Sequence, residues 1–115
     1  MKRDCCVYLR DILDAFYNAR QFVEGLSYKK FVTDRKTISA VVRELEIVGE
    51  ATKQLPASVR KKYPDVPWSD MAGMRDKLIH FYFGVDMEIV WETVKARIPD
   101  LEPLIEDVLS NLEQQ

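Results

Sequence analysis

The amino-acid sequence predicts an all-α protein, an up-and-down bundle of four to five helices. Apolar residues recur at the spacing of one helix face over long stretches that contain neither Gly nor Pro. The 115 residues include 4 glycines and 5 prolines, too few for the many turns of a sandwich or a barrel. Because 47% of the residues are hydrophobic, the chain can bury one core, and we expect residues 1–115 to form a single domain.

Two long helices are expected in the first half of the chain, over residues 4–24 and from residue 34 or 37 to 54. The first helix has its apolar residues at helical spacing and a plausible stop at Gly25; these residues are Leu9, Ile12, Leu13, Phe16 and Val23. The connector over residues 27–34 is expected to include one short turn that buries Tyr28 and Phe31. The second helix has the apolar stripe Ile38, Val41, Val42, Leu45, Val48 and Leu55.

Three further helical segments are expected in the second half. A short helix over residues 57–63 fits between prolines, and a third main helix starts near residues 67–70 and ends at Gly84. Asp86 then caps a fourth helix that is broken or kinked at Pro99 and continues as an amphipathic C-terminal segment. The side chains expected to face the core are Trp68, Ile89, Val90, Trp91, Val94, Leu101, Leu104, Ile105, Val108 and Leu112.

Charge and cysteine content narrow the possible functions. Residues 27–77 hold eleven Lys and Arg against seven Asp and Glu, whereas residues 78–115 hold two against eight. A net charge of −2 argues against a general nucleic-acid coat protein, but an enzyme that contacts a few phosphates remains possible. Cys5 and Cys6 are adjacent and are expected to be reduced thiols, without a zinc site. We find no signal peptide or apolar span and expect a cytoplasmic protein without membrane contact.

The only histidine, His80, lies in a run of residues that can do chemistry. Arg75 precedes it by five residues and Tyr82 follows it by two. On a straight helix Asp76 is one turn before His80, so its carboxylate can orient the imidazole. Arg75 and His80 diverge by about 140° on the same ideal helix. This geometry does not favour a compact catalytic triad within one chain.

Phosphodiester cleavage by an internal 2′-hydroxyl requires a base, an acid and a cation that stabilises the developing charge. A symmetric homodimer whose motifs face one cleft would supply two copies each of His80, Arg75 and Asp76. The sequence has neither the carboxylate cluster of a two-metal nuclease nor a phosphate-binding glycine loop. If the chain cleaves RNA, we expect it to do so without a metal or another cofactor.

The spacing also permits structural roles for the same residues. His80 is equally consistent with a buried, hydrogen-bonded helix residue, and Asp76 with a surface ion-pair partner. Phe81 and Phe83 are better explained as packing residues than as base-stacking platforms. Tyr82, taken alone, fits a core or interface position better than a modification site.

Several segments together resemble the HepT-like branch of the HEPN superfamily, small helical proteins of prokaryotic toxin–antitoxin pairs. The resemblance covers about residues 8–107. Its segments occur in order and are Asp34-Arg-Lys-Thr, Leu45-Glu-Ile-Val-Gly-Glu-Ala, Leu55-Pro, Tyr63-Pro, Pro67-Trp68, and Gly73-Met-Arg through Gly84-Val-Asp. The family motif is Arg, four residues, His, one residue, Tyr. It falls on Arg75, His80 and Tyr82 without departure, and the polar residue after the arginine is Asp76.

The resemblance implies a metal-independent endoribonuclease toxin whose Arg75 and His80 lie in a homodimer cleft. It also implies a cognate minimal nucleotidyltransferase antitoxin that silences the toxin by transferring AMP to Tyr82, as in a type VII-like pair. One alternative is a non-catalytic module that binds a nucleotide or docks the nucleotidyltransferase. Another is a helical scaffold without activity of its own.

Overall fold

The computed structural model describes residues 4–74, 76 and 86–114. Helices dominate this part of the chain and no strand occurs in it, which confirms the predicted all-α class. The elements are α1 (Cys5–Val23), α2 (Tyr28–Phe31), α3 (Arg35–Gln54), α4 (Ala57–Lys62), α5 (Trp68–Ala72), α7 (Met87–Glu92), the π-helical segment η1 (Thr93–Arg97) and α8 (Ile98–Glu113).

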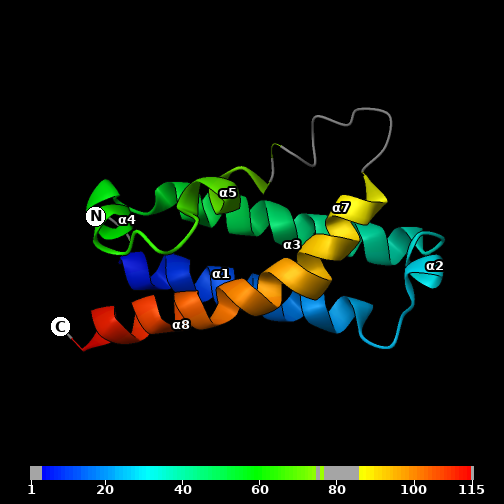
Figure 1. Cartoon of the computed structure of the whole chain (residues 1–115), viewed down its shortest axis with the longest axis horizontal. Helices are drawn as coiled ribbons and strands as arrows, with labels where there is room; N and C mark the ends of the chain where they lie inside the picture. The colour runs from blue at the N-terminus through cyan, green and yellow to red at the C-terminus, as the bar shows by residue number, and fades with distance from the viewer. Residues whose placement is uncertain (1–3, 75, 77–85, 115) are drawn as a thin grey trace.

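The three long helices α1, α3 and α8 form the body of the bundle (Figure 1). Helix α1 lies between the other two and contacts both, and the chain runs along α3 and α8 in the direction opposite to α1. The short helices α4 and α5 follow α3 back along its own length, and α7 crosses over α3 before the chain turns into α8. Both ends of the chain therefore lie at the same end of the bundle.

The boundaries of α1 and α3 agree closely with those predicted, because local capping groups determine them. Asp4 caps α1 by accepting a hydrogen bond from the Cys6 backbone N–H at 2.9 Å, and Asp34 caps α3 by accepting one from Thr37 at 3.1 Å. Gly25 follows α1 with a φ of 79°, a left-handed conformation that other residues adopt only with strain. The predicted stop at Gly25 is thus confirmed.

The core forms where the apolar stripes of the long helices meet. Burial of apolar side chains is the main favourable contribution to folding, and these residues supply it along the whole length of α1. Side chains with at most 1% exposure include Leu9, Ile12, Phe16, Val23, Phe31, Val41, Leu45, Val48, Met71, Val90, Val94, Ile98 and Ile105. Trp68 is also buried, and its indole N–H donates to the Tyr63 carbonyl at 2.9 Å.

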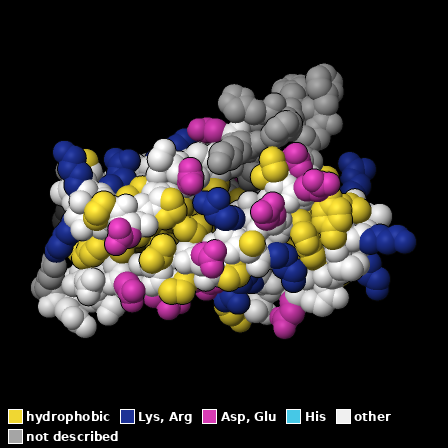
Figure 2. Space-filling model, viewed as in Figure 1, with side chains coloured by type: hydrophobic (Ala, Val, Ile, Leu, Met, Phe, Trp, Pro, Cys, Tyr) yellow, Lys and Arg dark blue, Asp and Glu magenta, His cyan; other side chains and the backbone are white. Residues whose placement is uncertain are grey.

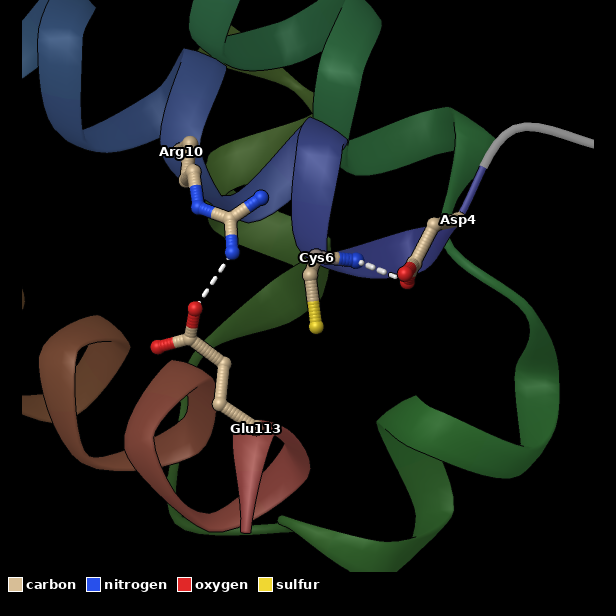
Figure 3. Close-up of polar contacts among 4 residues, drawn as sticks. All are labelled: Asp4, Cys6, Arg10 and Glu113. Carbon is tan, nitrogen blue, oxygen red and sulfur yellow. Dashed lines mark hydrogen bonds and ion pairs between the residues drawn. The ribbon is translucent and has the colours of Figure 1, made fainter. Parts of the chain in front are cut away.

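Polar contacts join α1 to its two neighbours. Arg10 of α1 and Glu113 of α8 point toward each other and form an ion pair near the chain ends (Figure 3). Farther along, the Arg20 guanidinium pairs with Glu102 of α8, with one of its nitrogens 3.1 Å from the carboxylate. Toward α3, the Asn18 amide donates to the buried Glu44 carboxylate at 2.8 Å. Exposed ion pairs add little stability, but together these contacts favour one axial alignment of the helices.

Some predicted core positions are only partly covered. Ile89 was expected to face inward, yet 40% of its surface is exposed. Trp91 is half-buried rather than a core anchor; its ring lies 5.1 Å from that of Phe31 and 5.9 Å from that of Tyr28. Tyr28 is likewise half-buried, whereas Phe31 is fully buried as predicted. The remaining partly covered stripe positions are Leu13, Val42, Leu104 and Leu112.

Pro99 changes the helix type without ending the helix. The chain stays helical from α7 through α8, but the Ile98 N–H bonds to the Thr93 carbonyl five residues earlier, as in a π-helix. Proline has no N–H to donate, and its ring crowds the carbonyl four residues before it. A wider turn before Pro99 relieves that crowding, so we attribute η1 to this residue. The predicted break at Pro99 is therefore a local widening.

No helix in the described ranges is long and apolar enough to cross a membrane.

Candidate functional site

Most of the predicted motif falls outside the part of the chain that the structure describes. This applies to Arg75, His80 and Tyr82. The third main helix, predicted to run unbroken from residues 67–70 to Gly84, is interrupted: α5 ends at Ala72, because Gly73, a poor helix former, makes a turn there. The rest of that prediction, toward Gly84, lies outside the described residues. The described residues that flank the motif are Met74 and Asp76 on one side and Asp86 on the other. The described part of the site consists of the surfaces on which the motif segment begins and ends.

Asp76 is the one predicted site residue that the structure describes. Its carboxylate lies 3.7 Å from the Lys53 ammonium in the last turn of α3, and both side chains are about half exposed. Lys53 thus places a cation from α3 beside Asp76, the residue that follows Arg75 in the sequence. Whether Asp76 also contacts His80 depends on residues outside the described ranges. An exposed ion pair at this distance is weak, so the Asp76 carboxylate can exchange Lys53 for another partner.

A pocket of about 190 Å³ lies where the chain enters and leaves the motif segment. Its apolar part comes from Leu45 of α3, from Met74, and from Ile89 of α7. Figure 2 shows Asp and Glu side chains beside the undescribed residues on this face, with a Lys or Arg side chain among them. The pocket therefore combines an apolar floor with a charged rim, the usual composition of a small ligand site.

The rim of the pocket is formed largely by η1 and α5. Arg97 of η1 donates a hydrogen bond to the Asp70 carboxylate of α5 at 3.3 Å. Thr93 also lines the pocket, and its hydroxyl donates to the Ile89 carbonyl at 2.7 Å. Glu92 completes the rim, and none of the described residues forms an ion pair with its carboxylate. The end of α7 and the π-helical turn that follows thus present three polar side chains to one cavity.

One group of potential metal ligands occurs among the described residues, at the start of α1. The ligand atoms of Asp4, Cys5 and Cys6 lie within 4.8 Å of one another. Burial, followed by the nearby Asp4 carboxylate, raises the pKa of the Cys6 thiol to about 11. Metals bind the thiolate, so Cys6 at neutral pH is a poor ligand. Asp4 is engaged as the α1 cap, and the hydrogen bond from the Cys6 backbone N–H lowers its pKa (Figure 3). Both cysteines are free thiols.

Comparisons with known proteins assign the chain to a family. A family model described as "Ribonuclease HepT-like" matches residues 12–108. The chain belongs to the HepT-like ribonuclease family. A Thermococcus cleftensis protein named "Probable ribonuclease HepT" is 47% identical to this HepT-like chain over 89% of it and 93% of the relative.

Two further relatives match the HepT-like chain along most of their length. "Putative RNase MJ0125" of Methanocaldococcus jannaschii is 43% identical over 99% of the chain and 98% of the relative. "Putative RNase TTE0752" of Caldanaerobacter subterraneus is 48% identical over 89% of the chain and 91% of the relative. No solved structure matches the chain significantly. The family expected from the sequence motifs is thereby confirmed.

Sequence reasoning missed several residues around the site. Lys53 lies in α3 and Arg97 in η1, both far in sequence from the residues they pair with. Their charges alone did not distinguish them from other surface cations. Glu92 gave no signal either, because an acidic residue on a helix is usually a solvated one. Only the tertiary structure brings these residues to the edges of the motif segment.

Proposed function

We propose that this HepT-like chain is a single-domain, metal-independent endoribonuclease toxin of a type VII-like toxin–antitoxin pair. The observation that carries the proposal is the family match together with an intact Arg75, His80 and Tyr82 motif. The ribonuclease names of the relatives support the reaction class. In this proposal the protein is cytoplasmic and works as a homodimer on RNA.

Each motif residue has one role in the proposed reaction. His80 removes the proton of the 2′-hydroxyl, and a second His80 from the partner chain protonates the leaving 5′-oxygen. Attack of the 2′-oxygen on phosphorus yields a 2′,3′-cyclic phosphate and a free 5′-hydroxyl. Arg75 stabilises the charge that develops on the phosphoryl oxygens, and Asp76 orients the imidazole.

Cleavage of single-stranded RNA by the purified protein in excess EDTA tests the reaction class. We expect cleavage at an undiminished rate, with 2′,3′-cyclic phosphate and 5′-hydroxyl ends identified by mass spectrometry of the fragments. The reaction needs only protein groups, so chelation should remove nothing from it. Cleavage that stops in EDTA and returns with added Mg²⁺ would contradict the proposal. A dimer measured by light scattering at micromolar protein is the accompanying expectation.

Tyr82 is proposed as the site at which the antitoxin silences the toxin. The partner would be a minimal nucleotidyltransferase: the Tyr82 oxygen attacks the α-phosphorus of ATP, an O–P bond forms and pyrophosphate leaves. On an ideal helix Tyr82 lies about 20° from Arg75 after two turns, so the added phosphate would occupy the guanidinium that RNA needs.

Tyr82→Phe should keep nuclease activity and escape silencing, because only the hydroxyl is removed. The chain and its cognate nucleotidyltransferase are co-expressed, and intact-mass and peptide spectrometry locate any adduct. We expect mass increments of AMP on Tyr82 in the wild type and none in the variant. An adduct on another residue, or silencing of Tyr82→Phe to the wild-type extent, would refute this role.

A further inference from the structure

We propose that the pocket beside the motif binds a guanine base of the RNA substrate and that Glu92 determines this preference. The inference rests on the proposed function, since the base would belong to the RNA that the motif cleaves. It adds a specificity-determining residue on α7, which neither the family match nor the relatives' names assign.

The position of the pocket makes it a subsite rather than a remote cavity. Met74, which lines it, directly precedes Arg75 in the sequence. Ile89, which lines it from the other side, lies in the first turn of α7, where the chain returns from the motif segment. A base held here would lie beside the start of the motif segment, where Arg75 is proposed to contact the phosphate.

The size and the floor of the pocket suit one flat ring system. About 190 Å³ is below the roughly 300–1,000 Å³ of pockets for drug-sized ligands, so a single base fits better than a whole nucleotide. Leu45 and Met74 are almost completely buried, and Ile89 leaves 40% of its surface exposed. A partly exposed isoleucine that lines a pocket provides an apolar surface on which the face of an unstacked base can lie.

The polar groups on the rim select among the bases. A carboxylate only accepts hydrogen bonds, and its two oxygens can accept from two adjacent donors. Of the four RNA bases, guanine alone presents two adjacent donors on its Watson–Crick edge, N1–H and the N2 amino group. Glu92 offers the matching carboxylate at the rim, and no described residue pairs with it.

Arg97 provides a complementary donor for the other edge of the same base. It uses one nitrogen to donate to Asp70 at 3.3 Å, and a guanidinium carries further N–H groups. Arginine donates to O6 and N7 of guanine in many nucleic-acid complexes. The pair with Asp70 is exposed and therefore weak, but it places the guanidinium beside the pocket that both residues line.

Inosine in place of guanosine tests the proposal, because inosine lacks only the N2 amino group. We compare cleavage of two RNA oligonucleotides that differ by this one base next to the cut. The wild type should cleave the guanosine oligonucleotide about tenfold or more faster, as expected for one lost specific contact. Glu92→Gln should cleave both at similar rates. Glu106→Gln is the matched control: it removes the same charge at an exposed position on α8 and should keep the wild-type ratio.

A binding experiment separates this inference from the proposed nuclease activity. Guanosine and inosine monophosphates are titrated into the full-length protein and followed by NMR chemical shifts. Tighter binding of guanosine monophosphate that is lost in Glu92→Gln supports the subsite even if no RNA is cleaved. Cleavage without any guanosine preference overturns the subsite and leaves the nuclease intact. Dissociation of the dimer in Glu92→Gln, with unchanged nucleotide binding, would place a second copy of the chain over the pocket and also overturn it.

Discussion

Replacing His80 or Arg75 with alanine is expected to reduce RNA cleavage by about a hundredfold or more. In the proposed reaction, the first substitution removes the group that transfers protons, and the second removes the positive charge that stabilises the transition state. Initial rates on a labelled oligonucleotide measure the effect, and circular dichroism confirms that the helices are intact. Arg10→Ala is the matched control, because Arg10 pairs with Glu113 near the chain ends (Figure 3). This variant should cleave RNA at the wild-type rate.

Mixed dimers test whether the two histidines of one cleft act together. A wild-type chain and a His80→Ala chain carrying different affinity tags are co-expressed, and the mixed dimer is purified through both tags. If one His80 acts as base and the other as acid, the mixed dimer should be nearly as inactive as the His80→Ala homodimer. A mixed dimer with half of the wild-type activity would show that each histidine acts alone. Full activity of the His80→Ala homodimer would contradict the assigned role altogether.

Phe16→Ala is expected to lower the free energy of unfolding by about 3–5 kcal/mol. Phe16 lies in the middle of α1 and is fully buried among the long helices, so the substitution leaves a cavity that the packed neighbours cannot fill. Such a loss is a large part of the total stability of a small domain, which is about 5–15 kcal/mol. Urea unfolding followed by circular dichroism measures it, at one protein concentration because dimer formation would shift the midpoint.

Tyr17→Ala is the matched control for the core substitution. Tyr17 is the next residue of the same helix, and 55% of its surface is exposed. Its replacement should change the unfolding free energy by no more than about 0.5 kcal/mol. Equal losses at the two positions would mean that α1 does not bury the face that the structure assigns to it.

The sequence by itself determined the helices of this protein, because their signals are local. The acidic caps Asp4, Asp34 and Asp86 each accept a backbone N–H from a residue two or three positions later. Gly25 supplies the left-handed turn after α1. Apolar periodicity likewise identified the faces that carry Phe16 and Leu45. The motif of Arg75, His80 and Tyr82 was also recognisable, since its residues lie within one short run of the chain.

Only the tertiary structure decided which surfaces those helices cover and which charges meet. Periodicity shows that a helix has an apolar face. How much of that face is covered depends on where the neighbouring helices pack. Ile89 remains partly exposed, although its spacing predicted burial. The contacts of Lys53 with Asp76 and of Arg97 with Asp70 join separate elements. Such pairs depend on the relative placement of α3, α5 and η1, which no local pattern encodes.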